Sequence, residues 1–355
     1  MSQNTANPDP IAWRAVSALY NALVTGLVVS LVVRRGTETA REYVFRHFRR
    51  QHLEKFLPGL AKLGLAGHPH AVACALYHYH SNALGGVKTE YFRQSDRKAW
   101  VRYPPPRWMW KGTAIAAIPH EVSAAMLHGW HGHNGVSLGN PRLGFVCTGM
   151  TVDGLPGLEG YYVEHDRDLS PAERVRFAYG EETMPRFDPS AAPRLEAASW
   201  PLERLERTRR RYAMDYVRTM LAVLDDLPGI PDPTSELARV ARLIGLQFYE
   251  EAAAEIAVKA GQTNAGAFAS WLQSMLAGQG EEITSVTDGE STSLHLTGWK
   301  LPKGLDLKNV GATFTAWNEL WIGACAAHDR FLRLDASASI VDGKISARWE
   351  ILPRA

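Results

Sequence analysis

Histidine side chains gather in one glycine-rich stretch of the chain, residues 128–147. The imidazoles of His131 and His133 can accept and release protons near neutral pH, which makes them candidate general acid–base catalysts. A carboxyl partner is available elsewhere in the chain, at Glu90 or Glu159. This stretch therefore predicts acid–base chemistry without a covalent intermediate.

Cys147 lies in the apolar run that ends this stretch, between Val146 and Thr148. A histidine of the preceding loop (His128, His131 or His133) would lower the pKa of the thiol and activate it as a nucleophile. A cysteine in such a run is also typical of a simple core position. Both interpretations stay open.

A metal site is the third alternative for the same histidines. His128 and His131 are spaced i, i+3, as on a helix end, and His131 and His133 would share one face of a strand. No acidic residue at close spacing completes a two-histidine, one-carboxylate set. We therefore expect these histidines to pack in the core or to face solvent, and we favour no cofactor. A divalent metal bound by His128, His131 and His133 is the alternative.

Ligand contacts are expected from arginine and aromatic residues around this stretch. Arg142 stands in a Gly-Asn-Pro-Arg turn, and its guanidinium suits a substrate carboxylate, although a surface arginine fits the same turn. The tryptophans of the Tyr103–Trp110 segment would form a rigid wall for a flat or hydrophobic ligand or a cation. Tyr161 and Tyr162 point to opposite faces of one strand, and the sequence does not tell which faces inward. The predicted binding residues are Arg142, Trp108, Trp110, Trp130, Glu90 and Tyr161.

An internal duplication organises the elements that carry these residues. Six residues of a helical segment between Ala71 and Gly86 have counterparts 194 positions later, with Trp271 in place of Tyr77 and the same residue type at the others. The tripeptide Val152-Asp153-Gly154 recurs 189 positions later. The sequence therefore predicts two similar repeats, over 12–165 and 202–355, joined by a proline-rich connection at 166–201. Each repeat is predicted to be α+β, a helical half followed by a small antiparallel sheet.

The same elements are expected in both copies. The Asp-Gly of the last match is a strong hairpin signal between two strands. The predicted helices are 15–33, 37–65, 70–84 and 119–127 in the first copy, and 202–227, 234–260, 264–276 and 314–326 in the second. The predicted strands include 99–103, 143–152 and 158–164 in the first copy, and 293–296, 332–340 and 344–352 in the second.

Composition separates the two copies and limits the function classes. Eleven of the thirteen histidines precede residue 200, so the first copy is predicted to be the active one and the second to be structural. A net charge of +2 gives no general attraction to nucleic acid, and three cysteines suit a reducing, cytoplasmic location. The apolar segment 15–33 contains several polar residues, so we expect a buried helix and no membrane association. A homo-oligomer is left open.

The succession of helical half, glycine-rich break and paired strands, with the closing strand–Asp-Gly–strand from Ala336 to Leu352, resembles the L-2-amino-thiazoline-4-carboxylic acid hydrolase family. It is similar, more loosely, to the four-vinyl-reductase small-molecule-binding domain. The first resemblance implies opening of a cyclic carbon–nitrogen bond, and the second implies binding of a hydrophobic small ligand. Some members of the second family carry a cysteine-rich zinc site, for which this chain has no cysteine cluster.

The prediction is therefore an enzyme that acts on a small organic molecule by hydrolysing a carbon–nitrogen bond. The alternatives are a binding or sensor protein without turnover, and a metal-dependent lyase or oxygenase. No P-loop, dinucleotide fingerprint, nucleophile elbow or zincin motif occurs, so the commonest nucleotide, nicotinamide and serine-hydrolase mechanisms are not expected.

Overall fold

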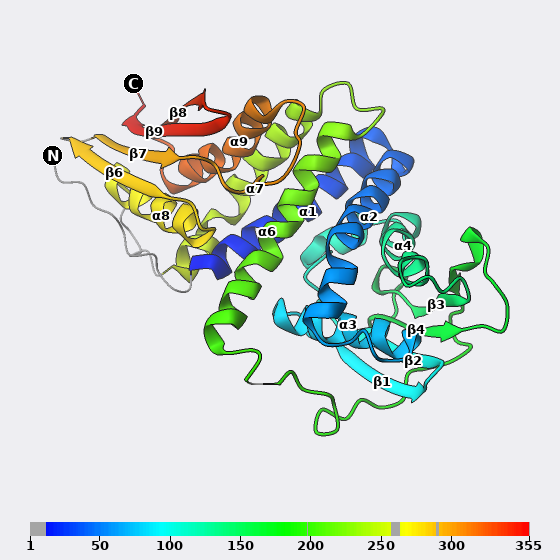
Figure 1. Cartoon of the computed structure of the whole chain (residues 1–355). Coiled ribbons are helices and arrows are strands. Elements are labelled where there is room, and N and C mark those ends of the chain that lie inside the picture. Colours follow the sequence, from blue (N-terminus) through cyan, green and yellow to red (C-terminus); the bar gives the residue numbers. More distant parts are fainter. Residues whose placement is uncertain (1–11, 197, 257–262, 289–290, 355) are drawn as a thin grey trace. The chain divides into compact units, whose positions relative to one another are not determined.

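The computed structural model describes residues 12–196, 198–256, 263–288 and 291–354 and divides into two compact units (Figure 1). The N-terminal unit comprises Leu31–Arg209. The C-terminal unit comprises the described residues up to Ser30 and from Arg210 onward. The predicted α+β class is confirmed. The unit boundaries differ from the predicted repeats, because most of the first helix is grouped with the C-terminal part of the chain.

The N-terminal unit has a five-stranded sheet in the order β1-β2-β4-β3-β5. Helix α3 packs on the sheet, and α2 packs on α4. All neighbouring strands are antiparallel except β3 and β5. The elements are α2 (Thr37–Lys62), α3 (His70–Leu84), β1 (Glu90–Ser95), β2 (Lys98–Tyr103), α4 (His120–Gly129), α5 (Asn134–Ser137), β3 (Leu143–Gly149), β4 (Leu158–Glu164) and β5 (Val175–Phe177), with 3₁₀ turns at Gly112–Ala117, His131–His133, Thr151–Asp153 and Pro171–Glu173.

The C-terminal unit has a four-stranded antiparallel sheet in the order β6-β7-β9-β8. Helix α8 packs on this sheet, and α7 packs on α9. Its elements are α6 (Leu202–Asp226), α7 (Pro233–Glu255), α8 (Ala265–Gly278), β6 (Ile283–Asp288), β7 (Ser291–Thr297), α9 (Val310–His328), β8 (Leu332–Val341) and β9 (Lys344–Pro353). The last four residues of the predicted helix 234–260 lie outside the described residues.

The Asp-Gly turn has the predicted geometry. Val341 pairs with Lys344, so only two residues connect β8 to β9, and both Asp342 (φ 50°) and Gly343 (φ 71°) are left-handed. Two successive positive φ angles define the type I′ turn that matches the twist of a hairpin. In the N-terminal unit Val152-Asp153-Gly154 likewise lies between β3 and β4.

Glycines allow a close helix crossing in each unit. A Cβ added to Gly129 of α4 would lie 2.6 Å from the carbonyl oxygen of Phe45 in α2. A Cβ added to Gly323 of α9 would lie 2.2 Å from the carbonyl oxygen of Arg242 in α7. Both distances are far below van der Waals contact, so only glycine permits these backbones to meet.

Helix α1 (Ala12–Arg35) is the one described helix long and apolar enough to cross a membrane. Its residues at i, i+3 and i+4 spacing, such as Leu19, Leu23 and Leu27, are almost completely buried. Within the C-terminal unit, the hydroxyl of Tyr20 donates to Gln279 and accepts from the Trp317 indole. These contacts are those of a helix packed by one face into a protein core.

Candidate functional site

A pocket of about 200 Å³ lies in the N-terminal unit beside the connection from β2 to α4. The connection carries Tyr103–Trp110, the segment predicted to form an aromatic wall. The walls are almost entirely apolar, and the volume is below that of drug-sized ligand sites, ~300–1,000 Å³. The residues that line it are Pro105, Pro106, Arg107, Met109, Trp110, Lys111, Gly112, Ile115, Ser123, Met150, Thr151, Val152 and Leu158.

Arg107 is the buried cation of this pocket, with only 9% of its surface exposed. Its guanidinium carbon lies 4.8 Å from the ring centre of Trp108 and 5.2 Å from that of Tyr103. Its Nη2 donates to the sulfur of Met126, 2.7 Å away. A guanidinium keeps its charge at every physiological pH, so this position exerts a fixed positive potential in a poorly solvated place.

Trp110 has the backbone strain that often accompanies a ligand site. Its φ of 60° places a bulky residue in the left-handed region, which costs of order 1–3 kcal/mol. The side chain is 3% exposed, and its indole Nε1 has no hydrogen-bond partner within the described residues. The hydroxyl of Thr151, which also lines the pocket, likewise has no hydrogen-bond partner within the described residues. Two buried donors without a described partner therefore belong to residues of the pocket wall.

Buried histidines lie beyond Arg107 in the interior of the unit. The ring of His131, in the turn after α4, stacks on that of His78 in α3 at 4.3 Å and 9°, and Tyr162 of β4 lies parallel to both. Asn134 donates to the Tyr162 hydroxyl, 2.9 Å away. Neither ring nitrogen of His131 has a partner in the described structure, nor does Nε2 of His78.

Burial keeps these imidazoles neutral. It lowers the pKa of His78 to about 3, with His52 and Arg107 adding to the effect. Burial also lowers the pKa of His131 well below its ordinary value, assisted by His78 and Arg107. The positive charge of Arg107 contributes to the lowered pKa of both rings. A neutral imidazole at pH 7 carries one N–H, so each ring can donate one hydrogen bond and accept one.

The other predicted catalytic residues are separated from the pocket. His133 Nδ1 makes a hydrogen bond with the carbonyl oxygen of His128 (2.8 Å), so these two residues tie the turn together. Cys147 is completely buried in β3, and burial raises its thiol pKa to about 12, which disfavours the thiolate. Its predicted role as a nucleophile stays a prediction.

The predicted binding residues also fall in different places. Arg142 pairs with Glu164 (2.9 Å), and Glu90 pairs with Arg102 (2.7 Å). Trp130 packs edge-on against His52, with 5.6 Å between ring centres, while Trp110 and Arg107 line the pocket.

The open question of the two tyrosines is answered by the sheet. Tyr161 packs at a tilt against Trp100 and donates to Glu182 (2.8 Å), in a small core with Met184. Tyr162 is the inward residue, against Phe145 and the histidine pair.

The sequence missed Arg107, His78 and His52 as site residues. His78 and His80 were not predicted to form a pair because they point to opposite sides of their helix. The side on which His78 lies faces the interior of the unit. Among the described residues, no three histidine, cysteine or acidic side chains are grouped to hold a metal ion. Whether the protein carries a cofactor stays open.

Comparisons with protein-family models, with curated proteins and with solved structures find no match to this chain. The family resemblance stated from the sequence therefore remains an expectation.

Proposed function

We propose that this protein binds a small organic anion in the pocket over Arg107. The observation that carries the proposal is a buried guanidinium, that of Arg107, in the wall of a largely apolar pocket. A cation with little access to water gains strongly from an oxyanion, and Arg binds carboxylates through two parallel hydrogen bonds. The apolar walls favour a compact hydrocarbon or aromatic body on that anion.

Hydrolysis of a carbon–nitrogen bond is the catalytic form of this proposal. The geometry that favours it is the His131 ring, stacked on His78 at 4.3 Å, with neither of its ring nitrogens bonded to a described residue. In such a reaction water attacks the carbon of the bond, the imidazole takes the proton from the water, and the departing nitrogen receives it. Arg107 would hold the anionic group of the substrate while His131 acts as the base.

We also propose that the two halves are tandem repeats of which the first is functional. Both sheets have the same strand order when counted from the first strand of each unit, apart from the short β5. The glycines at the helix crossings, Gly129 and Gly323, are 194 positions apart, the same offset as the repeat in α3 and α8. At that offset His78 corresponds to Leu272, and His131 to Cys325, so the second copy lacks the histidine pair.

Binding is tested with benzoate and its uncharged counterpart benzamide, by calorimetry and by thermal shift. We expect benzoate to bind and benzamide to bind more weakly. Arg107→Met should reduce benzoate affinity by roughly thirtyfold, the equivalent of about 2 kcal/mol for a charge-assisted contact, and Arg107→Lys should reduce it less. Lys111→Met, an exposed cation of the same pocket, is the matched control and should change little.

Location of the ligand is tested by filling the pocket. Val152→Trp should abolish benzoate binding, whereas Val136→Trp, at an exposed valine outside the pocket, should not. Equal binding of benzoate and benzamide, or binding that survives Val152→Trp in a folded variant, refutes the proposal. Ring opening of small cyclic carbon–nitrogen compounds, detected as a new amine group on the product and lost in His131→Asn, separates the hydrolase from a binding protein.

A further inference from the structure

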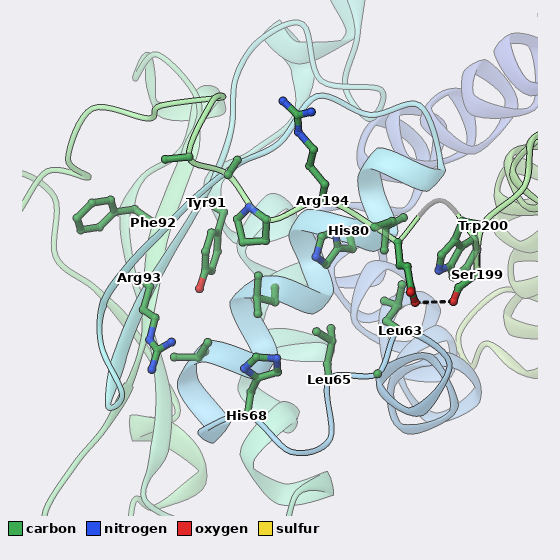
Figure 2. Close-up of a pocket in the computed structure, with 18 of the residues that line it drawn as sticks. Leu63, Leu65, His68, His80, Tyr91, Phe92, Arg93, Arg194, Ser199 and Trp200 are labelled. Atoms are coloured by element: carbon green, nitrogen blue, oxygen red, sulfur yellow. Dashed lines mark hydrogen bonds between the residues drawn. The ribbon is translucent and has the colours of Figure 1, made fainter.

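A second and larger hollow, about 760 Å³, lies in the same unit and shares no lining residue with the pocket over Arg107. Figure 2 shows it between the end of α2, helix α3, strand β1 and the connection 186–200. None of the residues predicted from the sequence as site residues lines it. Its volume falls within the range of ligand sites for organic molecules, ~300–1,000 Å³.

Much of the surface of this cleft is apolar. Leu65, Val72, Leu76 and Pro193 line it. Figure 2 shows Trp200 at one end, beside Leu63. Such walls favour a ligand with a sizeable hydrophobic body.

Polar side chains interrupt this apolar surface. His80 is 6% exposed and Tyr91 is 8% exposed, and the ring of each packs against that of Tyr79. Figure 2 places both of them, and His68, around the hollow. Burial lowers the pKa of His80 to about 4, assisted by His68, so its ring is neutral at pH 7 and offers one N–H. Both side chains line the cleft, where they can donate hydrogen bonds to a polar ligand group.

The charges around the cleft are predominantly positive. Four arginine or lysine residues line it, against two carboxylates, Asp188 and Glu196. Both carboxylates are held within their own turns, Asp188 by Ser190 and Glu196 by Ser199. In the described chain, Arg186 and Arg194 make no ion pair with either of them, and both remain available to an incoming anion.

We propose that this cleft is a second binding site, for an amphipathic organic anion. The hydrophobic body of the ligand lies on Leu65, Val72 and Leu76. Its polar end accepts hydrogen bonds from Tyr91 and His80, within the field of the arginines on the connection. Charge at the margin steers the anion to the cleft and sets its preference over neutral molecules.

The test uses two fluorescent probes that differ by one charged group, 8-anilinonaphthalene-1-sulfonate and uncharged N-phenyl-1-naphthylamine. We expect the sulfonate to bind at least tenfold more tightly to the full chain. The double variant Arg186→Ala/Arg194→Ala should weaken sulfonate binding about fivefold and leave the neutral probe unchanged. Arg34→Ala, at an exposed arginine outside the cleft, is the matched control and should alter neither.

The cleft is assigned as the site by a paired substitution in the connection. Ala191→Trp, inside the cleft, should lower sulfonate binding, and Ala198→Trp, an exposed alanine outside it, should not. Circular dichroism verifies that each variant is folded. Equal affinity for the two probes, or sulfonate binding that is indifferent to Ala191→Trp, overturns the proposal. Because benzoate binding is followed at Arg107, failure here leaves the first proposal intact.

Discussion

Acid is expected to destabilise the N-terminal unit because its interior holds neutral histidines. Burial lowers the pKa of His47, His52 and His78 to about 3 each, against 6.5 for an ordinary histidine. In the unfolded chain the same residues take up protons as the pH falls through 6.5. Above pH 6.5 the three histidines are neutral in both states and do not lower the free energy of unfolding. Below pH 6.5 only the unfolded chain binds the protons, so the free energy of unfolding falls with the pH.

The size of the effect follows from linkage. One pH unit below 6.5 costs ~1.4 kcal/mol for each histidine that is protonated only when unfolded. At pH 5 each of the three contributes a loss of about 2 kcal/mol, or about 6 kcal/mol together. Because pH 5 is far above 3, this loss depends mainly on the unfolded chain. It is comparable with the whole stability of a typical domain, ~5–15 kcal/mol.

The assay is urea denaturation at pH 7.5, 6.5, 5.5 and 5.0, followed by tryptophan fluorescence. His78→Leu should make the dependence on pH shallower by up to ~1.4 kcal/mol per pH unit. His295→Gln, at a half-buried histidine in the C-terminal unit, is the control and should not change the transition of the N-terminal unit. Equal stability of wild type at pH 7.5 and 5.0, or an unchanged slope in His78→Leu, would refute the reasoning.

Three further predictions concern packing, reactivity and capping. Gly323→Ala should destabilise the C-terminal unit by about 2 kcal/mol or more in urea, because its Cβ would lie 2.2 Å from the Arg242 carbonyl oxygen. Gly67→Ala should leave the stability of the protein nearly unchanged, because a Cβ added there meets nothing within 4 Å. In the folded protein the buried Cys147 thiol should react with a thiol reagent no faster than unfolding exposes it, and rapid labelling would contradict this. Asp232→Ala removes the cap that accepts from the amide at the start of α7 and should lower stability by ~1 kcal/mol in the same urea assay.

The sequence predicts the helices well because their apolar spacing and turn signals agree. Helix α3 has the predicted bounds, and α1 extends the predicted 15–33 by only a few residues at each end. Strands β1 and β6 were not predicted. β1 is short, polar over half its length and lies at the edge of its sheet, so it has little of the alternation that marks a strand.

The candidate site was less readable because burial cannot be seen in residue types. The Tyr103–Trp110 segment was expected to form a wall for a flat ligand or a cation. The structure buries a cation, Arg107, in that wall, so the wall itself is positively charged. Similarly, His80 looked like half of a failed histidine pair, although it reaches the cleft by facing away from His78.

The place of α1 in the C-terminal unit has a consequence during synthesis on the ribosome. Tyr20 finds its hydrogen-bond partner Gln279 only after 259 further residues have been added. At ~5–20 residues per second, the apolar face of α1 emerges roughly 10–50 s before its partners exist. The N-terminal unit can complete its own sheet in that interval, while the apolar face of α1 is still without its packing partners. The apolar face of α1 is therefore exposed for longer during synthesis than any surface whose partners lie nearby in the sequence.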